Sequence, residues 1–170
     1  KNAEQLKSEI LEEFASIEKD LTINISKADS SEKAISFEDS KKVVFSINGA
    51  NNGVFRMSPD VEGLVEASNN IARVELKNGE IKILNLTRSS VESTKWEVAN
   101  QLKSAFESNN LKTEFGGSYP GWKPKPGAEI IKIMTEIYEK DFGAKPHVVA
   151  CHAGLECGII GANYPKMEMV

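Results

Sequence analysis

Hydrophobic residues at helical spacing begin the chain and predict an amphipathic helix from about residue 2 to 19. From Leu21 to Ser26, apolar and polar residues alternate, and this period of two indicates a half-buried strand. A second helix is predicted from Ser36 to a stop at Asn48-Gly49, because Ser is a good N-cap and Gly is common just past a helix end. The apolar face of the first helix consists of Leu6, Ile10, Phe14 and Ile17.

The clearest local signal is Asn78-Gly79, which lies between two alternating runs, Ile71 to Leu76 and Ile81 to Leu86. Both central positions of a two-residue hairpin turn require positive φ, and Asn-Gly is the pair that best tolerates it. The sequence therefore predicts a tight β-hairpin here.

A further helix and strand are predicted after the hairpin. Ser89 and Glu92 have the spacing of a capping box, and the helix that they begin ends near Asn109-Asn110. Alternation from Leu111 to Phe115 then predicts a strand. The predicted elements from the second helix onwards follow the order helix, strand, strand, helix, strand. This order favours an α+β fold, a ferredoxin-like sandwich in which helices cover one face of an antiparallel sheet. The apolar face of the helix consists of Trp96, Ala99, Leu102 and Phe106.

The second part of the chain has a different character. Three prolines and four glycines between Gly116 and Gly127 predict a linker, with residues 117–126 at its centre. After it, the pattern predicts an apolar helix from Ile130 to Phe142 that Gly143 ends, then a buried strand from His147 to Cys151. Alternation at residues 167–170 predicts the start of another strand, and with Lys1 in place of an initiator Met this favours an excised piece of a longer chain.

Composition narrows the class of protein. The 170 residues are 40% hydrophobic and 27% charged, which is ordinary for a globular protein large enough to bury a core. A formal net charge of -4 with interspersed basic residues argues against a nucleic-acid partner, and no apolar run approaches the roughly 20 residues that span a membrane. The two cysteines argue against a disulfide framework and fit a reducing cytoplasm.

Candidate chemistry gathers in the loop from Cys151 to Gly158. His152 and Glu156 are titratable, and Gly154 permits unusual backbone angles or the close approach of a ligand. The same features also fit the polar turn at the end of a strand, so the loop alone leaves both interpretations open.

Two other interpretations of this region have less support. His147, Cys151, His152 and Cys157 are all zinc-ligand types, but they form no Cys-x-x-Cys or His-x-x-x-His pair. A cysteine nucleophile with His152 as its base would need a lowered thiol pKa, and no neighbouring residue in the sequence supplies the cause.

Four stretches resemble the aminoacyl-histidine dipeptidases, members of the large family of two-zinc peptidases and deacylases. They occur in the family's order and span most of the chain, which is far more specific than one short motif. The stretches are Asn52 to Ser58 continuing to Glu62 to Ser68, Thr87 to Ser93, Gly116 to Trp122, and His152 to Gly158 followed by Tyr164-Pro165.

This resemblance implies a division of the chain. Residues 1–116 would belong to a lid domain of the type that also pairs two subunits, residues 117–126 would be a linker, and residues 127–170 would return into a catalytic domain. The resemblance further implies a cytoplasmic enzyme that hydrolyses Xaa-His dipeptides with two zinc ions. The zinc ligands and catalytic residues of the family lie outside these stretches, so we expect neither bound metal nor activity in this chain alone.

The resemblance also implies roles for individual residues. Arg88 occupies the position of the lid arginine that grips the free carboxylate of the substrate, and an arginine beside a helix start is suited to that anion. His152, Gly154 and Glu156 would contact the substrate. The competing hypothesis is a non-catalytic α+β domain whose exposed faces mediate interaction or dimerisation.

Overall fold

A computed structural model describes residues 2–27, 29, 33–153 and 155–170. The chain divides into two compact units, one up to residue 34 and one from residue 35 onwards. Gly154 is not among the described residues, so its predicted contact with substrate remains a prediction.

The first unit contains the helix α1 (Ala3–Phe14). Its N-cap is Asn2, whose side chain accepts a hydrogen bond of 2.9 Å from the backbone N–H of Gln5. The predicted helix is therefore present but ends before residue 19. The strand predicted from Leu21 to Ser26 is wrong, since these residues have no regular secondary structure. An alternating segment becomes a strand only where a neighbouring strand pairs with it, and within the described part of the first unit none does.

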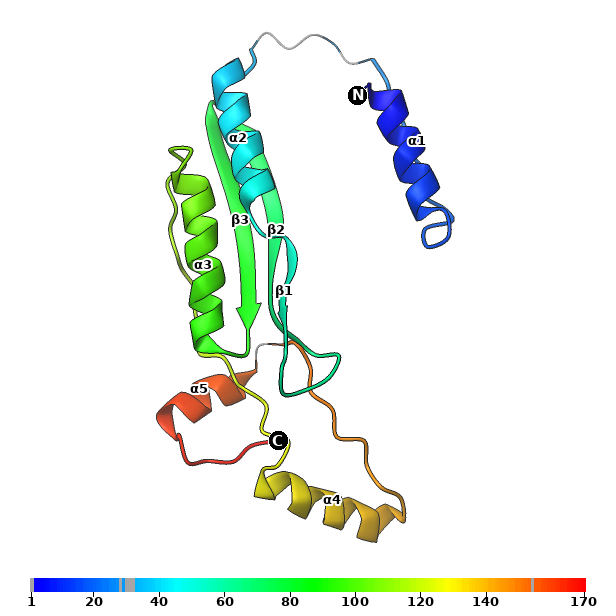
Figure 1. Cartoon of the computed structure of the whole chain (residues 1–170), viewed down its shortest axis with the longest axis vertical. Coiled ribbons are helices and arrows are strands. Elements are labelled where there is room, and N and C mark those ends of the chain that lie inside the picture. The colour runs from blue at the N-terminus through cyan, green and yellow to red at the C-terminus, as the bar shows by residue number, and fades with distance from the viewer. Residues whose placement is uncertain (1, 28, 30–32, 154) are drawn as a thin grey trace. The chain divides into compact units, whose positions relative to one another are not determined.

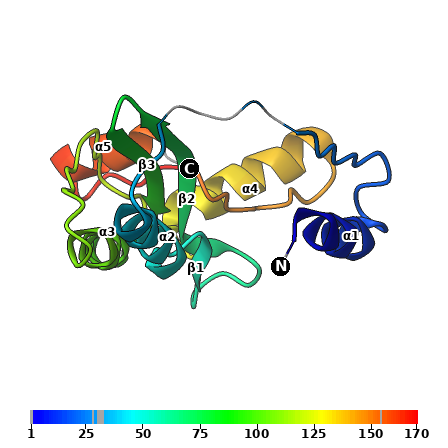
Figure 2. The same ribbon diagram turned by 90° about the horizontal axis from the view of Figure 1, so that it is seen from above.

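The second unit is an α+β structure built on an antiparallel sheet with the strand order β1-β2-β3 (Figure 1). The predicted α+β class is confirmed, although the described residues form three strands whereas a ferredoxin-like sheet has four. Helices α2 and α3 lie side by side on the same face of the sheet (Figure 2). The elements are α2 (Phe37–Gly49), β1 (Gly53–Met57), β2 (Val65–Lys77), β3 (Glu80–Ser89), α3 (Glu92–Glu107), α4 (Glu129–Phe142) and α5 (Glu156–Asn163).

The predicted hairpin is confirmed. Strands β2 and β3 meet at Asn78-Gly79, whose φ angles are 54° and 80°. Pairing begins at Lys77 opposite Glu80 and continues to Ala67 opposite Ser89. The register shifts by one residue between Ile71 and Arg73, as expected for a β-bulge.

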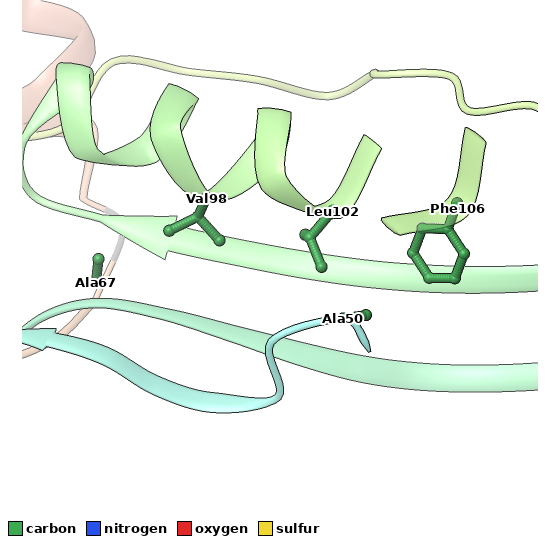
Figure 3. Close-up of a cluster of buried hydrophobic side chains, with 5 residues drawn as sticks. All are labelled: Ala50, Ala67, Val98, Leu102 and Phe106. Carbon is green, nitrogen blue, oxygen red and sulfur yellow. The ribbon is translucent and has the colours of Figure 1, made fainter. Parts of the chain in front are cut away.

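The core lies between α3 and the sheet, where Figure 3 shows its buried side chains. Val98, Leu102 and Phe106 are spaced by four residues, so they form one face of α3. They pack with Ala67 of β2 and with Ala50 at the end of α2. The predicted apolar face of this helix is thus confirmed for Leu102 and Phe106, whereas Trp96 remains partly exposed.

Four expectations after the hairpin are wrong. The capping box is absent: Val91 is the N-cap of α3, and Ser89 Oγ bonds to the backbone of Val91 instead of the helix. No strand forms at residues 111–115, 147–151 or 167–170, because no described strand lies beside them to pair with their backbone. Val149, which should lie in a buried strand, is 85% exposed.

Helix α4 confirms the predicted apolar helix and its end, where Gly143 adopts a left-handed φ of 67°. No residue of α4 is buried, however, and most of its apolar side chains are exposed. Exposed apolar surface of this extent marks a face that another part of a protein covers. Among the described residues, no helix has the length and apolar character needed to cross a membrane.

Candidate substrate-binding site

A cavity of about 450 Å³ lies in the second unit. Its walls are β3, the inner face of α3, the segment from residue 111 to 122, and residues 151–153 and 155. Small-molecule sites have volumes of about 300 to 1,000 Å³, so the cavity is of a suitable size for a ligand such as a dipeptide. Arg88 and His152 are both among its lining residues.

Arg88 lies at the carboxyl end of β3 and is directly opposite Ser68 of β2. Ala67, the neighbour of Ser68, is fully buried against α3, so the alternation of the strand places Ser68 and Arg88 on the face that the helices leave uncovered. Within the described part of the chain no carboxylate pairs with Arg88. The other two arginines do have partners, since Arg56 pairs with Glu66 and Arg73 with Glu75.

His152 joins the loop to the sheet beside Arg88. Its Nε2 lies 2.7 Å from Ser68 Oγ in a hydrogen bond between residues 84 positions apart, and the ring also bonds with the backbone of Val65. Burial lowers the pKa of His152 below its usual value, and the nearby charge of Arg88 lowers it further, although the bond with Val65 opposes both effects. The imidazole is therefore mainly neutral at pH 7, and Arg88 is the charged member of these two neighbours.

A buried carboxylate fixes the strand end that carries Arg88. Glu66 is 2% exposed, and its side chain binds Arg56 in two contacts, 3.1 Å from Nε and 3.4 Å from a terminal guanidinium nitrogen. Thr94 of α3 donates to the same carboxylate at 2.9 Å. The backbone carbonyl of Glu66 also accepts from the N–H of Ser90, two residues after Arg88. Glu66 thus ties β1, β2, the end of β3 and α3 together.

The segment at residues 119–121 docks on the first turn of α3 through Glu92 and Lys95. Glu92 pairs with Lys95 Nζ at 2.8 Å and accepts from the backbone N–H of Gly121 at 3.4 Å. Lys95 also donates to the carbonyl of Tyr119 at 2.8 Å. The bond with Lys95 holds the pKa of Glu92 below its usual value, with smaller contributions from Gly121 and Trp96, while burial opposes the shift.

Two glycines allow close backbone packing around the site. A Cβ on Gly121 would lie 2.7 Å from the carbonyl oxygen of Ser90, directly after the strand end that carries Arg88. A Cβ on Gly158 of α5 would overlap the carbonyl oxygen of Pro120. Real Cβ atoms do not come this close to other backbone atoms, so only glycine fits at these positions.

The other residues that the sequence suggested for chemistry are not arranged as a catalytic or metal site in the described part of the chain. Glu156 is exposed in the first turn of α5 and does not line the cavity, so its contact with substrate remains a prediction. Cys151 and Cys157 are free thiols, and in the described part of the chain neither forms a hydrogen bond with His152. No three His, Cys, Asp or Glu side chains gather as a metal site among the described residues. The residues present therefore do not fit a zinc ion.

Sequence reasoning missed Ser68, Glu66 and Lys95 as parts of this site. The first two lie in a stretch that carries the family resemblance, but no local signal links them to Arg88. The link depends on the bulge in β2. Continued from the turn without the bulge, the register would place Asn69 opposite Arg88; with it, Ser68 takes that place.

No protein-family model matches the chain. Among curated proteins it is similar to the cytosol non-specific dipeptidase of Escherichia coli (strain K12), with 33% identity over 158 residues that cover 93% of this chain and 33% of the relative. Among known structures it is similar to a crystal structure of aminoacylhistidine dipeptidase from Vibrio alginolyticus, with 34% identity and a TM-score of 0.89. That match covers 96% of this chain and 34% of the other.

Both relatives are dipeptidases, and both match almost the whole of this chain. The chain belongs to this family of dipeptidases. It spans about a third of the length of each of the two relatives.

Proposed function

We propose that this chain is the substrate-gripping lid segment of a zinc-dependent dipeptidase that hydrolyses Xaa-His dipeptides, together with the start of the segment that returns to the catalytic domain. The observation that supports it is that Arg88 and His152 line the same cavity. Arg88 has no described carboxylate partner, so its charge is available to an anion.

The chemistry of the cavity suits the free carboxylate of a dipeptide. A guanidinium can bind both oxygens of a carboxylate at once, which fixes the orientation of the substrate as well as holding it. His152 contributes a neutral polar group beside it, already oriented by Ser68 and Val65. In this proposal the chain's own residues bind and orient the substrate, and zinc bound elsewhere in the full-length protein would activate the attacking water.

The proposed division of the chain is a lid at residues 1–116, a linker at 117–126 and a catalytic-domain segment at 127–170. The exposed apolar face of α4 supports it, since that face would be covered in a larger protein. The relatives' names do not favour a self-contained interaction domain. Cytoplasmic location and a homodimer through the lid are further parts of the proposal, which fractionation of cells and sedimentation of the full-length protein would test.

The test is a comparison of the full-length protein and this chain alone. The full-length protein should hydrolyse Xaa-His dipeptides in a zinc-dependent way, and the 170-residue chain should neither hydrolyse them nor bind stoichiometric zinc. In the full-length protein, Arg88→Ala should lower kcat/KM about 10²-fold with little change in Tm, and Arg88→Lys should recover only part of the loss. Turnover by the chain alone would contradict the proposal.

A further inference from the structure

Ser68 is the residue through which the sheet holds the loop that carries His152. Its backbone lies in the middle strand, between Val54 of β1 and Arg88 of β3. Its hydroxyl bonds to His152 Nε2 at 2.7 Å, and among the described residues this is the only hydrogen bond of that hydroxyl. Within the described part of the loop, the bonds of His152 with Ser68 and Val65 are the only hydrogen bonds to the sheet. One serine thus connects the strand position opposite Arg88 to the imidazole.

Two observations give the direction of the hydrogen bond between Ser68 and His152. The bond with the backbone of Val65 raises the pKa of His152, so it favours the protonated ring, as expected if a ring N–H donates to the Val65 carbonyl. A neutral imidazole has a single N–H, so its other nitrogen can only accept. The 2.7 Å distance fits a hydroxyl donor and is shorter than the usual length of about 2.9–3.0 Å for an N–H donor. Both observations make Ser68 Oγ the donor and Nε2 the acceptor, with the ring proton on Nδ1.

We propose that Ser68 is a positioning residue of the substrate site. Its hydroxyl fixes the imidazole of His152 in one tautomer and one orientation, and thereby holds the loop beside the strand end that carries Arg88. With Nε2 bonded to Ser68 and Nδ1 to Val65, the loop cannot leave the sheet without breaking both bonds. A dipeptide held by Arg88 then meets a loop that is already in place, which avoids the cost of ordering it on binding. The effect on catalysis rests on the proposed function, whereas the tautomer of His152 does not.

The hydroxyl of Ser68 can be removed with little effect on the sheet. Pairing of β2 with its neighbours uses backbone groups, and the buried contact at this level is made by the adjacent Ala67. Ser68→Thr keeps a hydroxyl, and threonine is favourable in a strand. Asn70 is a matched control, because it lies two residues further along the same face of β2 and does not line the cavity.

Nitrogen NMR of the imidazole ring in the 170-residue chain measures the tautomer. The chain has two histidines, so His147→Gln leaves only the signals of His152. At pH 7.5, Nε2 should give the signal of an acceptor and Nδ1 that of a protonated nitrogen. Ser68→Ala should give the averaged signals of a free imidazole, and Ser68→Thr should keep the original ones. A proton on Nε2, or signals that are identical with and without the hydroxyl, would overturn the inference.

The kinetics of the full-length enzyme test the consequence for the substrate site. Ser68→Ala should lower kcat/KM for an Xaa-His dipeptide about 10-fold, the effect of one lost hydrogen bond, with little change in Tm. Ser68→Thr and Asn70→Ala should both stay within about threefold of the wild type. Because Ser68 acts through His152, Ser68→Ala should cost less than about twofold in a His152→Ala background.

Two kinetic results would reject the positioning role and leave the dipeptidase proposal intact, provided that Arg88→Ala loses activity as expected. The first is an unchanged kcat/KM in Ser68→Ala. The second is an equal loss from Ser68→Ala with and without the His152 side chain, which would mean that Ser68 does not act through the imidazole. If the full-length protein hydrolysed no dipeptide, the proposed function would fail, and the NMR result would then decide whether Ser68 fixes His152.

Discussion

Replacing Arg56 by alanine tests the buried carboxylate that supports the site. Glu66 is 2% exposed, and Arg56 provides two of its three side-chain contacts, so Arg56→Ala leaves a buried charge held by Thr94 alone. Removing one partner of a buried ion pair costs about 3–5 kcal/mol. The Arg56 side chain is 47% exposed, so water can partly replace it, and we expect about 3 kcal/mol.

Urea unfolding of the 170-residue chain at 25 °C measures this cost. With a slope of about 1.5 kcal/mol per molar urea, the midpoint should fall by about 2 M. Arg73→Ala is the matched control, because Arg73 forms an exposed pair with Glu75 and should cost at most about 1 kcal/mol. The double variant Arg56→Ala with Glu66→Gln should be more stable than Arg56→Ala, since it removes the uncompensated charge.

The reasoning would be refuted by equal unfolding midpoints for Arg56→Ala and Arg73→Ala. It would also be refuted if Glu66→Gln brought no recovery in the Arg56→Ala background. Either result would mean that water solvates the Glu66 carboxylate and that the contacts with Arg56 and Thr94 do not hold the strand end in place.

Two further predictions concern the C-terminal part. Gly158→Ala should release α5 from Pro120, seen as faster hydrogen exchange and proteolysis of α5, whereas Gly161→Ala in the same helix should be tolerated because its Cβ meets only the end of a flexible side chain. His152 has a lowered folded-state pKa, so its contribution to loop docking should be complete above about pH 6.5 and decrease as the pH falls below that value. Proteolysis of the loop should therefore be faster at pH 5.5 than at pH 7.5, and His152→Gln should remove this difference. A pH effect that persists in the variant would show that titration of His152 is not its cause.

Local chemistry made part of the fold predictable. The Asn78-Gly79 turn and the Gly143 helix end each depend on a residue that accepts positive φ, and both appear in the structure as expected. The helical face of Leu102 and Phe106 was also predictable, because it depends only on spacing within one element.

The expectations that failed depend on partners distant in sequence. Residues 21–26 and 147–151 have strand-like patterns, but a pattern supplies no neighbour to accept their hydrogen bonds. The candidate site likewise depends on residues that are far apart in the sequence. The bond between Ser68 and His152 spans 84 positions, and the bulge that aligns Ser68 with Arg88 leaves no recognised mark in the sequence. The resemblance suggested Arg88 and His152 as substrate contacts, which remains a prediction, and the structure shows that both line one cavity and that Ser68 bonds to His152.

The most direct test of the proposed site is the selectivity of the full-length enzyme for a free carboxylate. The measurement is kcat/KM for one Xaa-His dipeptide and for its C-terminal amide, in the wild type and in Arg88→Ala. If Arg88 holds the carboxylate, Arg88→Ala should lose about 10²-fold on the dipeptide while its activity on the amide stays within about threefold of the wild type. An equal loss on both substrates, or a loss below about threefold on the dipeptide, would show that Arg88 does not bind the carboxylate.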